Sequence, residues 1–369
     1  MRGTIQAQPD FLTVIHLNQC VPSDHPLRAI KAHVDAVLKK LSPLFAELYA
    51  AAGRARIPPD QLLKPRVLTA LYSVRSERRF CEQLGYNLLW LWFLDREFSE
   101  GRFDHSCFAK NCPRGLAADV AKLFFLEVYD LSRAAGWTSD EHFTAGGTLI
   151  EAWASLKSFV RQDGADAAKV ESAKAEDPGN PTINFRGGKR RNDTHQSTTD
   201  AASVLYRKAN GTTARLCFGA SALMENRHGL CADFTLHNPL TQSEPAVALQ
   251  PMDAHQKLHD GVNVQTVGAD KGYHKKGFVA GCRERGSAPP VACKDKTKVA
   301  GLDGRTTTQK SYAVSLKIRK RVEEIFGWIK TVGGFRRSRY RGLERTQAWG
   351  DFVAGTYSLL RMARLGVAA

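Results

Sequence analysis

Two acidic residues in the second half of the chain could take part in phosphoryl-transfer chemistry. Asp270 follows the apolar run Val264–Val267, so it should lie at the carboxyl end of a strand, where open α/β sheets place their sites. Glu323 falls on a helix predicted over residues 314–331, four residues after Arg319 and on the same helix face. Cutting and rejoining a phosphodiester can use two divalent metal ions about 4 Å apart, held by about three carboxylates. On their own, acids of this kind are more often solvated surface side chains than metal ligands.

Positive charge is in excess along the chain. Lys and Arg number 53 against 37 Asp and Glu, which gives a formal net charge of +16. An excess of this size favours polyanions, chiefly nucleic acid, although an unspecific basic surface would have the same charge. The basic residues that could bind phosphates lie in two patches, which are Lys189, Arg190 and Arg191, and then Arg336, Arg337, Arg339 and Arg341.

The first 138 residues have helical patterns. Pro26 suits the first turn of a helix, and apolar residues recur after it at helical spacing. Residues 73–94 are predicted to form helix, break and helix, with the break at Gly85. This order is compatible with a helix-turn-helix that docks on DNA and equally with plain helical packing.

The pattern changes after Ser139, where short β-type runs alternate with helices. A helix is predicted over Glu244–His259 and a long one near residue 314, and residues 161–212 are predicted to be a long polar insertion. The order of elements predicts an α/β fold with a ribonuclease-H-like mixed sheet and flanking helices over residues 139–369, preceded by an all-helical domain over residues 1–138. The predicted strand runs are Thr148–Ile150, Arg215–Phe218, Leu230–Phe234, Val264–Gly268 and Pro290–Cys293.

Several other site classes and locations are disfavoured. No stretch approaches the roughly 18 continuous apolar residues of a membrane span, and the N-terminus has no signal-peptide core, so we expect a cytoplasmic chain that uses no membrane. The eight cysteines include no CxxC pair that would indicate zinc. His255 and His259 are spaced to bind a metal from one helix face, but no acidic motif such as HExxH accompanies them.

Segments along nearly the whole chain, from about Asp24 to Leu365, resemble those of insertion-sequence-5-type transposases, which belong to the insertion-sequence-4 superfamily of bacterial DDE transposases. The similar segments keep the family's order. They are Arg75–Arg79, Gln83–Leu89, Thr148–Trp153, Thr194–Asp200, Ala222–Leu230, Gly268–Tyr273 and Arg319–Lys330.

The resemblance implies a function and roles for individual residues. Asp270 would be the second catalytic Asp and Glu323 the catalytic Glu, and both would hold metal, Mg²⁺ or Mn²⁺, with two ions in an intact site. Arg319 and Lys330 match the family spacing around Glu323 and would contact phosphate. The protein would bind the terminal inverted repeats of an insertion sequence, cut the strands and join them to target DNA. Double-stranded DNA is the implied partner, with a homo-oligomer in the DNA complex.

The chain departs from the family at the first catalytic Asp. The family has Asp-Gly-Thr, whereas this chain has Gly146, Gly147 and Thr148. Glycine has no side chain that could bind metal. Asp140 lies six residues before Gly146 and Glu151 five residues after it, and along a straight strand each would lie ~16 Å or more away, so neither is expected to replace the missing side chain.

Smaller departures support the same interpretation. The wider pattern has a tyrosine three residues before Arg319, where this chain has Leu316, and Tyr312 is a possible substitute. Other departures lie at Pro65, Gly188, Ala201 and Ala202. We therefore expect a catalytically impaired copy. An alternative is an inactive DNA-binding derivative that inhibits active copies, and a third is a metal nuclease with another substrate on the same fold.

Overall fold

The computed structural model describes residues 16–48, 58, 60–106, 108–110, 118–162, 190–208, 211–259, 264–293 and 301–368. Within these residues, no helix is long and apolar enough to cross a lipid bilayer.

Helices form the N-terminal region, as its apolar spacing predicts. Pro26 begins the long helix α2, where its missing N–H costs no helical hydrogen bond. The helix-break-helix prediction is confirmed, with Gly85 as the C-cap of α4. The elements are α1 (Leu17–Cys20), α2 (Pro26–Leu48), α3 (Asp60–Leu71), α4 (Glu77–Leu84), α5 (Leu88–Phe93), η1 (Phe98–Glu100) and α7 (Ala118–Ala134).

The sheet has the topology that the order of elements predicts. Its strands are β1 (His142–Glu151), β4 (Val204–Tyr206), β5 (Arg215–Glu225), β6 (Cys231–His237) and β7 (Thr266–Gly268). Strand β5 pairs antiparallel with β1 and with β6, and β7 pairs parallel with β1. A parallel bridge between Ala269 and Val291 adds the last predicted strand run beside β7. Three antiparallel strands followed by parallel ones make a ribonuclease-H-like mixed sheet.

Two strands are longer than their apolar runs. Strand β5 continues through Gly219, Ala220, Ser221 and Ala222, and every residue after Arg215 is buried. These small residues are poor strand formers by composition, but they suit a central strand with neighbours on both faces. Part of the predicted insertion is also ordered: β2 (Phe159–Arg161) pairs with β3 (His195–Ser197) after η2 (Leu156–Ser158).

Two predicted single helices are each divided in two. The helix over 244–259 is α9 (Glu244–Val247) and α10 (Gln250–Leu258), because Pro251 lacks an N–H and suits only a first turn. The helix near 314–331 is α13 (Lys310–Ile318) and α14 (Arg321–Lys330). At the start of α14 the N–H of Glu323 donates to the Lys320 carbonyl at 2.9 Å. This bond spans three residues, as in a 3-10 turn, which is tighter than an α-helical turn. The other helices are η3 (Lys271–Tyr273), α11 (Lys276–Glu284), α12 (Gly304–Thr307) and α15 (Leu343–Ala368).

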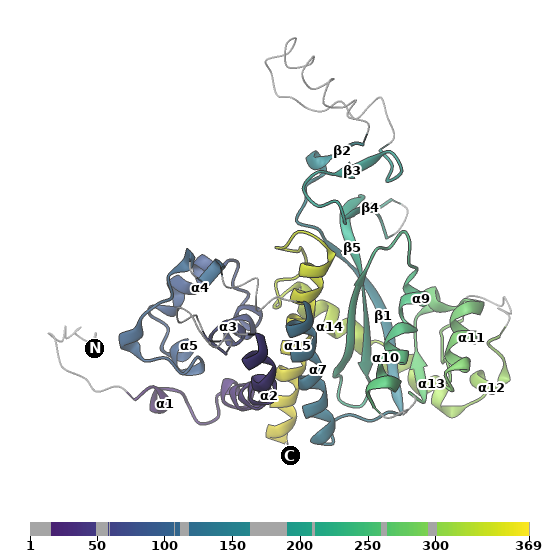
Figure 1. The fold of residues 1–369 in the computed structure, drawn as a ribbon. Helices are drawn as coiled ribbons and strands as arrows, with labels where there is room; N and C mark the ends of the chain where they lie inside the picture. The colour runs from purple at the N-terminus through teal and green to yellow at the C-terminus, as the bar shows by residue number, and fades with distance from the viewer. Residues whose placement is uncertain are drawn as a thin grey trace, which may run out of the picture.

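Helices cover both faces of the sheet, and one of them joins it to the N-terminal region. Figure 1 shows α7 and α15 side by side between the N-terminal helices and the sheet, with α9, α10 and α11 beyond the opposite face. Helix α15 packs against α2, α3, α7 and β6, and the rings of Phe124 and Phe352 lie 5.2 Å apart. One hydrophobic core therefore extends across residue 138, and the division into domains there stays a prediction.

A buried charge network lies where α7, β6 and α15 meet. The Lys122 ammonium contacts the Asp233 carboxylate at 2.8 Å. Asp351 is only 1% exposed and accepts a hydrogen bond from the Gln347 amide at 2.9 Å. Burial raises the pKa of Asp351 to about 7, although the charge of Lys122 opposes the rise.

This raised pKa gives a pH dependence to the free energy of unfolding. The folded state holds the Asp351 proton more tightly than the unfolded chain, so its stabilising contribution is present below about pH 4 and is lost as the pH rises through about 7. Asp351→Asn stays neutral and keeps an acceptor for Gln347. We expect the variant to match the wild type near pH 4 and to exceed it by a few kcal/mol, on the order of 1.4 per pKa unit, above pH 7. Chemical denaturation at both pH values measures this, and equal stabilities at pH 8 would contradict the account.

Candidate active site

Asp270 lies directly after β7, at the carboxyl end of that strand. It caps the short helix η3, with its Oδ1 accepting from the Gly272 N–H at 2.7 Å, and its side chain is exposed. Pairing between β1 and β7 ends at Thr144 and Gly268, so β1 has an open edge beside Asp270 until its last residue, Glu151, bridges to Arg337. The predicted position of Asp270 is thus the one observed.

Glu323 lies in the first turn of α14, which packs against β1. The helix buries its apolar face, including Val322, and leaves Glu323 exposed. Arg319 precedes the helix at the tightened turn. Its Nε atom is buried and has no hydrogen-bond partner among the described residues. A buried guanidinium nitrogen without an acceptor is suited to an incoming anion.

These residues share one cleft with a volume of about 280 Å³. Asp270 comes from the end of β7, Glu323 and Arg319 from the start of α14 and the turn before it, and Gly146 from the middle of β1. Three segments far apart in the sequence therefore converge, in the manner that a phosphoryl-transfer site requires. The lining residues are Thr144, Ala145, Gly146, Gly147, Thr148, Lys208, Asp270, Arg319, Val322, Glu323 and Phe326.

Gly146 is closely covered by α14. A Cβ atom at this position would lie 2.8 Å from Val322 Cγ1 and 3.0 Å from Cγ2, with Phe326 Cε2 at 3.4 Å. Val322 is buried and β-branched, so its χ1 is restricted. The space in which the family's first Asp would begin is thus occupied by a methyl group.

Glu244 reaches the opposite face of β1, a contact that the sequence does not reveal. A Cβ atom on Gly147 would lie 2.7 Å from Glu244 Cδ, so the carboxylate is in direct contact with the strand because residue 147 has no side chain. Burial raises the pKa of Glu244, and the Asp270 carboxylate adds to the rise, while Lys208 and Lys275 oppose it. Glu244 is therefore an acidic neighbour of Asp270, and only the close approach at Gly147 could have indicated it.

Two lysines bind the same stretch of β1. The Lys330 ammonium donates to Thr148 Oγ1 at 2.5 Å, and the Lys208 ammonium donates to the Gly147 carbonyl at 3.1 Å. Burial lowers the pKa of Lys330, and the nearby charges of Lys208 and Arg336 lower it further. Lys330 is among the residues that the sequence indicates, whereas Lys208 is not, because a single lysine after a short strand has no distinctive pattern.

The remaining predicted phosphate-binding residues have different surroundings. Arg337 donates to the carbonyls of Ala152 and Trp153, at 3.1 and 2.7 Å. Arg339 is half-buried and stacks over the ring of Trp349, 5.7 Å from its centroid. These contacts engage both guanidinium groups within the protein.

Exposure differs among the members of the two basic patches, and Arg337 is exposed despite its hydrogen bonds. Arg336, Arg341 and Arg191 are exposed, while Arg190 donates to the Leu156 carbonyl at 3.2 Å. Lys189 and Gly188 lie outside the described residues.

Asp140 and Glu151, the acids considered as replacements on either side of Gly146, have other partners. Asp140 accepts from Arg133 at 2.6 Å and contacts His255 Nε2 at 2.9 Å, and Glu151 is ion-paired with Arg215. Neither lines the cleft. The contact of His255 with Asp140 also accounts for one histidine of the pair at i and i+4.

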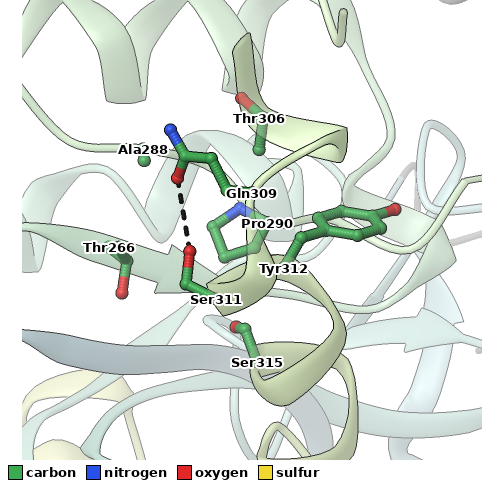
Figure 2. A pocket seen from close by; sticks show the side chains of 8 residues that line it. All are labelled: Thr266, Ala288, Pro290, Thr306, Gln309, Ser311, Tyr312 and Ser315. Carbon is green, nitrogen blue, oxygen red and sulfur yellow. Dashed lines mark hydrogen bonds between the residues drawn. The ribbon is translucent and has the colours of Figure 1, made fainter. Parts of the chain in front are cut away.

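Tyr312, the possible substitute for the family tyrosine, lies in another pocket. Figure 2 shows its ring beside Pro290 and Gln309, and its hydroxyl donates to the Val291 carbonyl at 2.9 Å. Burial raises the pKa of Tyr312 to about 12. Its side chain does not line the cleft that holds Asp270.

The acidic pair suits a divalent cation but forms no complete cage. Mg²⁺ prefers oxygen ligands and is usually bound through one or two carboxylates, with water and substrate phosphate completing its shell. Asp270 and Glu323 supply such oxygens from two sides of one cleft. In the part of the chain that the structure describes, no three His, Cys, Asp or Glu side chains lie close enough to hold a metal ion.

Fold and cleft together place the chain among ribonuclease-H-like α/β proteins. Two family models match it: the transposase domain DUF772 over residues 15–114 and the transposase DDE domain over residues 190–359. The chain therefore belongs to the DDE transposases, a family of DNA transposases. Asp270 and Glu323 fall within the matched DDE range, and Gly146 falls between the two matched ranges.

Two solved transposase structures have distant similarity to the chain. A piggyBac transposase synaptic complex with hairpin DNA is 7% identical, with a TM-score of 0.40, and the match covers 95% of this chain and 77% of that one. A pre-cleavage Mos1 transpososome is 9% identical, with a TM-score of 0.19 and coverage of 87% and 82%. No curated protein matches the chain.

The packing at Gly146 predicts energetic coupling between two positions. Gly146→Asp should lower the free energy of unfolding by about 1–3 kcal/mol, because its Cβ overlaps Val322. In a Val322→Ala background the added cost should shrink by about 1 kcal/mol. Urea denaturation of the four chains measures this coupling.

A matched control separates packing from the general effect of a new Asp. A Cβ at Gly277 meets nothing within 4 Å, so Gly277→Asp should cost little and show no coupling to Val322→Ala. If the costs of Gly146→Asp and Val322→Ala simply add, α14 does not restrict position 146.

Proposed function

We propose that this chain is an insertion-sequence-5-type transposase whose cleft acts on the terminal inverted repeats of an insertion sequence. One observation carries the proposal: Asp270 and Glu323, the residues that match the family's catalytic acids, line a single cleft although they come from separate elements. The residues that match its phosphate contacts lie beside them, since Arg319 lines the cleft and Lys330 binds β1 at Thr148.

In this proposal Asp270 and Glu323 would hold Mg²⁺ or Mn²⁺, and a bound ion would supply Lewis-acid activation of the attacking oxygen and charge stabilisation of the leaving oxygen. Arg319 and Lys330 orient the phosphate by hydrogen bonds to its non-bridging oxygens. In cleavage a water oxygen bonds to phosphorus and the 3′ oxygen leaves. In joining that 3′ hydroxyl attacks a target phosphate and displaces a second 3′ oxygen. Neither step needs a covalent bond between DNA and protein.

We also propose that catalysis by this copy is impaired. Position 146 offers no carboxylate, and Val322 covers the space where one would begin. Asp140 and Glu151 are bound elsewhere. A chain that folds and binds DNA ends but cuts poorly could occupy ends or enter mixed complexes, and so inhibit active copies.

The helical region up to residue 138 is proposed to contact DNA ends and to support a homo-oligomer in the DNA complex. Arg75, Arg78 and Arg79 lie exposed on or just before α4, with Tyr86, 66% exposed, beyond its end. Helix α5 has six residues and buries Trp90, Leu91 and Phe93. The accessible charge thus favours α4 over α5 as the element that meets the DNA backbone.

Strand cleavage tests the proposed function. Labelled duplex carrying the inverted repeat that flanks the gene is incubated with Mg²⁺ or Mn²⁺ and the wild-type chain, Gly146→Asp, or Gly146→Asp with Val322→Ala. We expect weak cutting by the wild type and a gain of at least tenfold in the double variant, which has both the carboxylate and the space for it.

Adding Asp270→Asn to the double variant should abolish the gain while DNA binding persists. Efficient cutting by the wild type would refute the impairment and show that another group completes the site. If the wild type and the double variant both fail to prefer the inverted repeat over a scrambled duplex, the transposase assignment itself is contradicted.

A further inference from the structure

Three cations from separate segments surround the second half of β1, next to the cleft. Lys208 follows β4, Lys330 ends α14, and Arg336 precedes α15. Lys330 and Arg336 are already candidates for phosphate contact from the sequence, whereas Lys208 has no assigned role. The inference below rests on the proposed function and extends it to this residue.

The strand fixes where the cations lie. Lys208 donates to the Gly147 carbonyl and Lys330 to the side chain of the next residue, Thr148. The carbonyl of Arg336 accepts from the N–H of Glu151, which anchors the third segment to the same strand. The ammonium groups are thus held by hydrogen bonds to β1.

The charges around this stretch do not balance. The pKa of Lys330 is lowered by burial and by the charges of Lys208 and Arg336, so each of these two cations lies close enough to Lys330 to repel its ammonium group. Glu151 opposes this effect but is itself ion-paired with Arg215, and Glu244 lies close enough to Lys208 for the lysine to oppose the rise of its pKa. Like charges at close range cost energy that a bound anion would recover.

The position of Lys208 indicates which kind of anion would bind these cations. Lys208 is exposed and lines the cleft with Asp270, Glu323 and Arg319. Its flexible ammonium still has two protons to donate after its bond to Gly147. A phosphodiester of the DNA strand that enters the cleft would meet all three cations and leave the neighbouring phosphate facing the acids.

We propose that Lys208 is a DNA-binding residue that, with Lys330 and Arg336, holds a backbone phosphate of the strand next to the scissile one. It would fix the register of the strand in the cleft without reading its bases. Lys208 touches substrate in this account, and its contribution should depend on the charge of one phosphate.

A thermodynamic cycle between protein and DNA tests this. Inverted-repeat duplexes each carry a neutral methylphosphonate at one position near the cut site, and Kd is measured for the wild type and for Lys208→Gln. We expect Lys208→Gln to weaken binding to the unmodified duplex about tenfold, as for one charged hydrogen bond. The salt dependence, as the slope of log K against log salt, should fall by about 1.

At one position, or two adjacent ones, the methylphosphonate and Lys208→Gln should not add, because each removes the same contact. Lys310→Gln is the matched control, since Lys310 is exposed at the start of α13 and lies outside the residues lining the cleft. It should lower the affinity less and show no coupling at any position.

The outcomes separate this inference from the proposed function. If the wild type prefers the inverted repeat over a scrambled duplex but Lys208→Gln shows no coupling at any phosphate, the role of Lys208 is overturned and the function stands. If the wild type has no such preference, the proposed function is contradicted, and the inference about Lys208, which rests on it, is contradicted with it. Additive effects at every position, with equal losses for Lys208→Gln and Lys310→Gln, would reduce Lys208 to a non-specific surface charge and overturn the inference.

Discussion

The close approach of two helices to the glycine pair of β1 is the constraint on which the site depends. Helix α14 covers Gly146 through Val322, and α9 brings Glu244 against Gly147 on the other face. Because neither residue has a side chain, α14 can pack directly on the strand and the Glu244 carboxylate can reach it. This contact fixes Glu323 above the open edge of β1, where Asp270 also lies.

The same packing links the absence of a carboxylate at position 146 to the shape of the cleft. A side chain at 146 has to displace a buried, β-branched neighbour, so a single substitution changes both the charge and the packing of the site. Asp270 and Glu323 line the cleft together with the cations Arg319 and Lys208. Lys208 and Lys330 also bind β1, at Gly147 and Thr148.

The sequence predicted those features that depend on local pattern. The mixed sheet and the position of Asp270 after its strand follow from apolar runs and strand order, and the structure has both. The full length of β5 could not be predicted, because its Gly219–Ala222 stretch becomes a strand through burial between neighbours. The break between α13 and α14 likewise depends on tertiary packing.

Contacts between distant segments could not be predicted from the sequence, because they depend on how the folded chain brings those segments together. Glu244 occupies the space left by the missing side chain of Gly147, and Lys208 donates to the Gly147 carbonyl. Nothing in the sequence around Glu244 or Lys208 indicates either contact. Arg337 and Arg339 belong to a dense basic run that predicts phosphate binding, and the structure adds contacts that the run does not indicate: Arg337 donates to backbone carbonyls and Arg339 stacks on an aromatic ring. Composition gives the amount of charge, and packing decides which charges face solvent.

In the proposed function, Asp270 and Glu323 hold a divalent ion together in one cleft. The most direct test is the affinity of the DNA-bound chain for Mn²⁺, measured from the signal of free Mn²⁺ in electron paramagnetic resonance. Asp270→Asn and Glu323→Gln should each weaken binding about tenfold or more, and the double variant should be little worse than either, because the two act at one site. Unchanged affinity in both single variants, with DNA binding intact, would contradict the account.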